Sequence, residues 1–236
     1  MDHFTPVDTM NGSLFLRSVV EPDLTNSVHF LMPVTGFDYQ GQPVTPPGFD
    51  KEYDLYLTID ATAINNPNGT VNHYTSLNVT LWADPKNDAG TPSVSETSDP
   101  AFSNGMANDI VLATGTMVSA SMTLDPTTMI RQADLVESLT PTLEGTILLD
   151  GSIKPGSLLE EKTTALPANF QAFPQPDGGT INIVSGGTVQ ITLDPQGTIL
   201  LPDITHGHLY LAEGPRFIHS GGDGHHGGNE RGRDWR

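Results

Sequence analysis

The sequence predicts an all-β protein with an antiparallel β-sandwich or jelly-roll-like fold, and three observations support this prediction. Apolar and polar residues alternate over short segments, Gly and Pro are abundant at 24 and 19 residues, and Lys and Arg together number only 10 of 236. Alternation is the period of a half-buried strand, and Gly and Pro form the turns between strands. Long helices would use more Lys and Arg. A chain of this length can bury a core without help from disulfides or metals.

The clearest strand is predicted over residues 53–61. Its odd positions are all apolar, whereas three of the four even positions between them are polar. The same pattern returns at 77–81, 181–183 and 189–193. The last two segments are separated by Ser185-Gly186-Gly187, which predicts a hairpin turn.

The remaining elements follow from weaker patterns in the same sequence. Further strands are predicted at 13–20, 28–34, 109–124, 145–149, 197–201 and 207–211, and short helices fit 129–139 and 156–163. Two short motifs occur twice: Met122–Pro126 resembles Ile191–Pro195, and Gly-Thr-Ile-Leu-Leu stands at both 145–149 and 197–201. We expect one β domain over 1–218. Residues 84–108 form a long polar loop of the kind that binds a ligand or is mobile, and the Gly- and His-rich residues 219–236 predict a disordered tail.

The charge of the chain excludes several classes of partner. Acidic residues number 28, which gives a formal net charge of −18. Such a surface repels nucleic acid and anionic lipid, and it attracts cations. The chain has no Cys, as is common in bacterial extracellular β proteins, and it has no apolar run long enough for a membrane-spanning helix. We expect a secreted or cell-surface bacterial protein whose signal peptide has been removed.

Three segments resemble a known family. They are Tyr53–Thr62, Tyr74–Pro85 and Asn108–Thr116, and Asn169–Phe173 followed by Gly179–Ile183 adds a closing segment. Together they resemble the extracellular body of flocculation-associated PEP-CTERM proteins, which belong to the bacterial exopolysaccharide matrix. The Pro-Glu-Pro sorting signal of that family is absent, and His219–Arg236 stands in its place. The resemblance implies a shared extracellular body, with extracellular polysaccharide or other matrix proteins as partners.

Histidines near the carboxyl end suggest a transition-metal site. In a strand, His206 and His208 would point to the same side and could bind one Zn²⁺ or Cu²⁺. Glu213 or His219 would supply a third ligand, and the His-x-His-x4-Glu spacing resembles the first metal motif of cupins. A metal-binding protein centred on His206 and His208 is therefore one alternative function, and a cupin-type metalloenzyme is a more remote one.

Two other sites are candidates for binding. The 84–109 loop offers oxygen ligands that suit Ca²⁺, at Asp84, Asn87, Asp88, Asp99, Asn108 and Asp109. Trp82 and Tyr56 are candidates for an exposed aromatic platform on which a sugar would stack, as in a carbohydrate-binding module.

No motif indicates catalysis. The chain has no Cys and no Gly-x-Ser-x-Gly, and nothing in the sequence pairs the carboxylates Glu144, Asp150, Glu160 and Glu161 as in a glycosidase. The sequence therefore predicts a non-catalytic structural or adhesive protein of the bacterial extracellular matrix. Metal binding and carbohydrate binding remain the alternatives.

Overall fold

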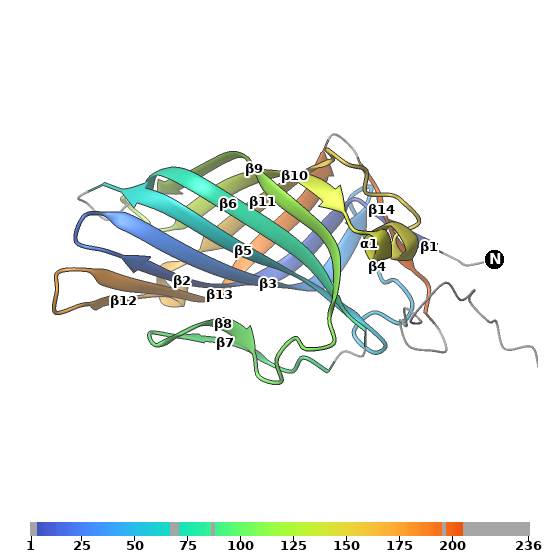
Figure 1. Ribbon diagram of the computed structural model, residues 1–236, viewed down its shortest axis with the longest axis horizontal. Helices are drawn as coiled ribbons and strands as arrows, with labels where there is room; N and C mark the ends of the chain where they lie inside the picture. The colour runs from blue at the N-terminus through green and yellow to red at the C-terminus, as the bar shows by residue number, and fades with distance from the viewer. Residues whose placement is uncertain (1–3, 67–70, 86–87, 195–196, 205–236) are drawn as a thin grey trace, which may run out of the picture.

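The structure is a computed structural model, and it describes residues 4–66, 71–85, 88–194 and 197–204. Strands make up most of this part of the chain, which confirms the all-β prediction. Eight of these strands form an antiparallel barrel in the order β11-β10-β9-β6-β5-β3-β2-β13 (Figure 1). Their bounds are β2 Thr9–Val20, β3 Thr25–Tyr39, β5 Asp54–Asn65, β6 Val71–Asp84, β9 Ile110–Leu124, β10 Arg131–Pro141, β11 Leu158–Ala165 and β13 Thr180–Asp194.

The sheet closes on itself through β11, which pairs along both of its edges. Glu161 of β11 lies opposite Leu135 of β10 on one side and opposite Ile191 of β13 on the other. The predicted sandwich or jelly roll is therefore replaced by a single closed sheet. Closure gives each of the eight strands a partner strand on both sides. It also gives the protein a single core inside the barrel, whereas a sandwich would have its core between two sheets.

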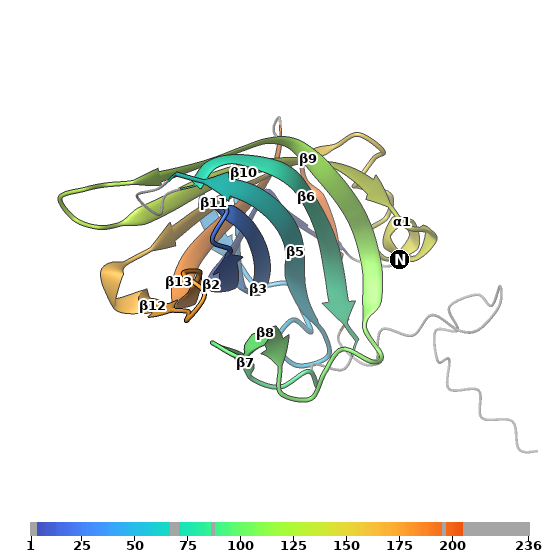
Figure 2. The ribbon, with the colours of Figure 1, turned by 60° about the vertical axis from the view of Figure 1, so that its left-hand side comes forward.

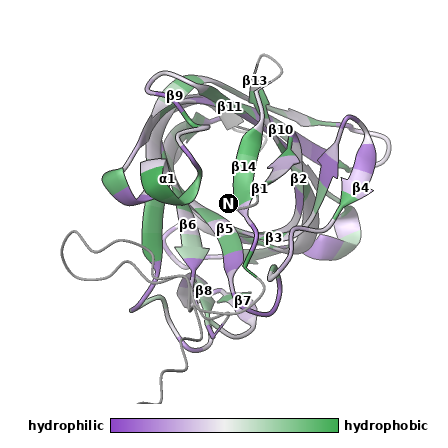
Figure 3. Ribbon diagram, turned by 90° about the vertical axis from the view of Figure 1, so that its right-hand side faces the viewer, coloured by the Kyte–Doolittle hydropathy of each residue, from purple (hydrophilic) through white to green (hydrophobic). Residues whose placement is uncertain are grey.

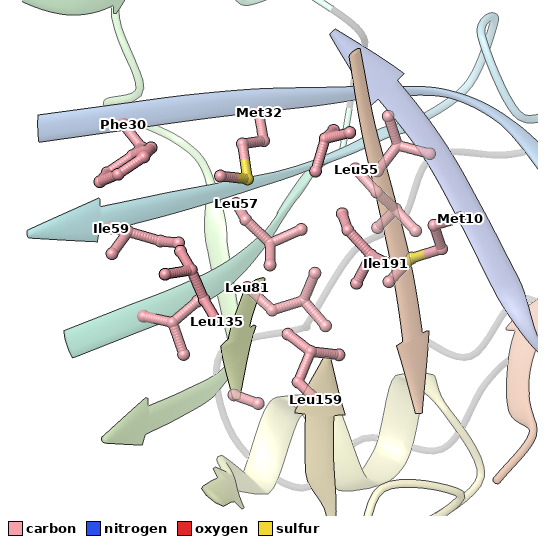
Figure 4. Close-up of a cluster of buried hydrophobic side chains, with 14 of the residues drawn as sticks. Met10, Phe30, Met32, Leu55, Leu57, Ile59, Leu81, Leu135, Leu159 and Ile191 are labelled. Atoms are coloured by element: carbon pink, nitrogen blue, oxygen red, sulfur yellow. The ribbon is translucent and has the colours of Figure 1, made fainter. Parts of the chain in front are cut away.

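Inward-facing apolar side chains fill the barrel, as the alternation predicted. In β5 the residues Leu55, Leu57, Ile59 and Ala61 are at most 5% exposed, whereas Asp60 between them is exposed. Figure 4 shows this core, in which Leu57 and Ile59 of β5 lie near Leu81 and Leu135 from other strands.

One end of the barrel is closed by short elements. β1 (Phe4–Val7) pairs with β14 (Ile199–Pro202), and helix α1 (Leu143–Leu148) contacts β9 and β10 at the same end (Figure 3). Apolar side chains from these segments are buried in the core, among them Val7, Leu149, Ile199 and Leu201. The short strand β4 (Gln42–Val44) pairs with β3. No helix in the described part of the chain is long and apolar enough to cross a membrane.

The predicted loop at 84–108 contains a hairpin that packs on the outside of the barrel (Figure 2). Strands β7 (Pro92–Ser95) and β8 (Ser98–Phe102) form this hairpin, and it contacts β2, β3 and β13. The Arg17 side chain of β2 donates hydrogen bonds to the Glu96 carbonyl oxygen at 3.1 Å and to the Asp99 carboxylate at 2.9 Å. The hairpin therefore covers part of the barrel wall.

Four predicted elements have a different structure. Residues 145–149 lie in and just after α1 instead of in a strand. Residues 129–139 and 156–163 belong mainly to β10 and β11 instead of to helices, because their side chains alternate between the core and the surface. Ser185-Gly186-Gly187 is a β-bulge within the continuous strand β13, where the register against β2 shifts and Gly186 takes a φ of 80°. The strand predicted at 207–211 and the tail at 219–236 lie outside the described residues.

Candidate ligand cavity at the open end of the barrel

A cavity of about 210 Å³ opens at the end of the barrel opposite α1. Its apolar wall comes from inward-facing residues that are at most 7% exposed, including Leu14, Leu16, Val28, Phe30, Ala133 and Val184. An enclosed apolar cavity of about 150 Å³ is enough to bind benzene. This cavity therefore has room for a ligand of roughly eight non-hydrogen atoms.

Amide and hydroxyl side chains form one side of the cavity rim. Asn26 of β3 is 4% exposed, and its Nδ2 donates a hydrogen bond to Oδ1 of Asn65 on β5 at 3.1 Å. Asn182 of β13 donates to Oγ of Ser18 on β2 at 3.3 Å. Oδ1 of Asn26 is buried and accepts no hydrogen bond from the described residues. On this side of the rim, Asn26 and Asn182 thus each use one amide N–H, and one buried acceptor is open.

Arg131 forms the opposite side of the rim, at the first residue of β10. Its guanidinium carbon lies 3.5 Å from the centroid of the Phe170 ring, at the start of β12 (Phe170–Pro174), which follows the short 3₁₀ helix Pro167–Asn169. No ion pair or side-chain hydrogen bond joins Arg131 to any described residue. Burial lowers the pKa of Arg131 below its ordinary value, as expected for a cation partly removed from water without an anion beside it.

Two buried glutamates lie just below the cavity. Thr163 lines the cavity, and Glu161 is the next inward-facing residue of β11. Glu161 and Glu137 are both 0% exposed, and their carboxyl oxygens have no hydrogen-bond partner among the described residues. Burial raises the pKa of Glu137 from 4.5 to about 8. Burial, with the charge of Glu137 as a second cause, raises the pKa of Glu161 well above its ordinary value. Burial therefore favours the protonated form of both carboxyl groups.

The candidate calcium residues are only partly brought together. Asp84 is 1% exposed, and its Oδ2 accepts a hydrogen bond from the backbone N–H of Ala89 at 2.9 Å. Asp88 is exposed, and its Oδ1 accepts a hydrogen bond from Asn108 at 3.3 Å. Asp99 instead pairs with Arg17, and Asn87 lies outside the described residues. The described residues contain no group of three His, Cys, Asp or Glu arranged to hold a metal, so calcium binding here stays a prediction.

The predicted aromatic platform is covered on one side. Tyr56 is 0% exposed, because Trp82 stacks on it with 6.0 Å between ring centroids and Phe102 of β8 packs against it edge-on. Its hydroxyl donates a hydrogen bond to Asp109. Tyr56 is therefore not an exposed platform for a sugar. Trp82 is half-buried, and its Nε1 donates to Oγ1 of Thr58 at 2.9 Å.

The predicted transition-metal ligands lie beyond the last described residue. His206, His208, Glu213 and His219 are all outside the described part of the chain. The structure therefore does not test whether these side chains come together, and the Zn²⁺ or Cu²⁺ site stays a prediction.

Sequence reasoning did not single out Arg131, Asn26 or Glu137. Arg131 and Glu137 lie in the segment predicted as a helix. The signal that could have found them is the period of two shared by Ala133, Leu135 and Leu139, which places both charged residues on the inward face of a strand. Glu161 was considered among the carboxylates, but its neighbour in the core is Glu137, from the adjacent strand.

Comparison with known proteins adds no further evidence. No family model matches the chain, and no curated protein or solved structure matches it. The resemblance to flocculation-associated PEP-CTERM proteins therefore stays a prediction.

Proposed function

We propose that this chain is a binding protein whose barrel takes up a small, largely apolar molecule at its open end. The observation that carries the proposal is the cavity of about 210 Å³ with an apolar wall and a rim of polar side chains. Binding sites for small molecules are typically concave, mostly apolar and largely preformed, with a few polar groups that orient the ligand. The mouth of a small barrel is a common place for such a site.

The rigidity of the barrel supports this proposal. The cavity wall is built from strands that are hydrogen-bonded on both sides, such as β2 between β13 and β3. A preformed wall loses little conformational freedom when a ligand enters, so more of the interaction energy appears as affinity. An extracellular, non-catalytic role in a bacterial matrix is compatible with such a protein and remains part of the proposal.

Titration with 1-octanol tests the proposal, because this neutral molecule has nine non-hydrogen atoms and an apolar chain. We expect binding by calorimetry with a Kd of roughly 0.1 mM, from a ligand efficiency of about 0.6 kcal/mol per atom. Ala133 is 4% exposed and lines the cavity, so Ala133→Leu adds three carbon atoms to the space that the ligand needs. This variant should weaken binding at least tenfold while folding normally.

The matched control is Ala101→Leu, because Ala101 is exposed on β8, away from the cavity. This variant should bind 1-octanol as the unmodified protein does. Absence of octanol binding by the unmodified protein would overturn the proposed function. Equal binding by the Ala133→Leu variant would place the binding site elsewhere.

A further inference from the structure

Arg131 is a cation in an apolar cavity that offers it no anion. Among the described residues, its one defined contact is the face of the Phe170 ring, and none of the described carboxylates pairs with it. No Asp or Glu lines the cavity. We infer that the cavity binds a monocarboxylate with a short apolar chain, whose head is held by Arg131 and whose chain extends into the barrel. This inference rests on the proposed function and names its ligand class.

The contact with Phe170 leaves the guanidinium edge available. At 3.5 Å between Cζ and the ring centroid, the two planes must be nearly parallel, because a nitrogen directed at the ring would come too close to it. The N–H groups lie in the guanidinium plane, so they point parallel to the ring face and not into it. Two parallel N–H donors match the two oxygens of a carboxylate, and such paired, charge-assisted hydrogen bonds are about twice as strong as neutral ones.

The rest of the rim competes poorly for a charged head group. Asn26 donates one hydrogen bond to Asn65, and Asn182 donates one to Ser18, so each of these amides already uses a donor within the rim. The acceptor that stays open, Oδ1 of Asn26, would repel a carboxylate. The head group is therefore directed to Arg131, on the opposite side of the rim.

The apolar chain of the ligand fits the space between Arg131 and the glutamate pair. The inward-facing residues below Arg131 on β10 are Ala133 and Leu135, and Leu14, Val28 and Phe30 face them from β2 and β3 across the cavity. The room for roughly eight non-hydrogen atoms takes the seven-carbon chain of an eight-carbon carboxylate, whose charged head lies at the rim. Burial favours the protonated form of Glu161 below, which weakens its repulsion of an anion in the cavity. The net charge of −18 acts mainly over distances that salt screens, about 8 Å at physiological ionic strength.

Octanoate and 1-octanol form a matched pair for the test, because they share the chain length and differ in the charged head. We expect calorimetry at pH 7.5 to show octanoate binding about tenfold to a hundredfold more tightly than octanol to the unmodified protein. Arg131→Met should lower octanoate binding to the level of octanol binding, and a far-ultraviolet circular dichroism spectrum and melting temperature like those of the unmodified protein should show that the variant is folded. Arg131→Lys should restore only part of the advantage, because an ammonium group lacks the paired donors.

Arg17→Met is the control for a general effect of charge. Arg17 lies on the outside of the barrel and pairs with Asp99, so its loss should leave octanoate binding unchanged. Equal losses in the Arg17 and Arg131 variants would overturn the assignment of the head group to Arg131. Octanol binding that equals or exceeds octanoate binding in the unmodified protein would overturn the carboxylate inference and leave the proposed function standing. If neither probe binds, both fall.

Discussion

The buried pair Glu137 and Glu161 makes the stability of the barrel depend on pH in an unusual direction. In most proteins acidic groups stabilise the fold as pH rises, because their folded pKa is lowered. Here burial raises the pKa of Glu137 from 4.5 to about 8, so the folded protein keeps a proton that the unfolded chain releases. The contribution of Glu137 is fully present below about pH 4.5 and is lost as pH rises toward 8.

The size of the effect follows from the shift. Each pH unit between the unfolded and folded values corresponds to about 1.4 kcal/mol, so the rise to about 8 amounts to roughly 5 kcal/mol at most. Glu161 acts in the same direction. A typical domain has only about 5–15 kcal/mol of net stability, so the loss should be easy to measure.

Urea unfolding followed by circular dichroism at pH 5 and pH 8 measures the effect. We expect the unmodified protein to lose several kcal/mol of unfolding free energy over this range. The isosteric Glu137→Gln variant should be close to the unmodified protein at pH 5 and more stable than it by about 2–4 kcal/mol at pH 8. The gain is smaller than the full shift because, at pH 8, part of the folded unmodified protein has itself released the Glu137 proton.

Glu160→Gln is the matched control, since Glu160 precedes Glu161 in the chain and its side chain pairs with Lys162 outside the core, at 2.9 Å. Such surface pairs contribute about 1 kcal/mol or less, so this variant should follow the unmodified protein at both pH values. A flat unfolding free energy from pH 5 to 8 would refute the reasoning. A Glu137→Gln variant that is less stable than the unmodified protein at pH 8 would refute it too. Either result would require a Glu137 carboxylate that is charged and well paired in the folded protein.

Two further predictions concern the closed end of the barrel and the carboxyl-terminal histidines. Gly145→Ala should cost about 3 kcal/mol in urea unfolding, because a Cβ there would lie 1.8 Å from the Leu112 carbonyl oxygen. Gly197→Ala should cost less, because its Cβ meets only the Leu193 side chain, so equal costs would contradict this account. Zn²⁺ should bind at most modestly at pH 7.5, more weakly as pH falls through about 6.5, and not at all after His206→Ala with His208→Ala. Calorimetry decides this, and binding that survives the double change would place the site elsewhere.

Local patterns in the sequence determined the fold class and several strands. The alternation at 53–61 and 77–81 predicts β5 and part of β6 with the correct inward face, because side-chain period depends only on the local backbone. The bulge at Gly186 was not predictable in this way. A flexible glycine permits either a turn or a bulge, and the partner strand β2 decides which one forms.

The cavity could not be predicted from local patterns. Arg131 and Phe170 lie far apart in the sequence and meet because β11 pairs with both β10 and β13. Pairing between distant strands depends on the whole set of competing partners, which no single segment encodes. The period of two places Glu137 on the same face as Leu135 and Leu139, but that face becomes the inside of a core only once the barrel is complete.

The segment Gly-Thr-Ile-Leu-Leu occurs twice and takes a different conformation each time, so tertiary contacts and not local sequence decide its structure. The five residues are identical at 145–149 and 197–201, yet the first copy lies in and just after helix α1 and the second supplies most of strand β14. At the first site Thr142 accepts a hydrogen bond from the Gly145 N–H and begins the helix. At the second, Ile199–Leu201 pair with β1, from the other end of the chain. Local propensity alone leaves both conformations within reach, and the tertiary contacts select one at each site.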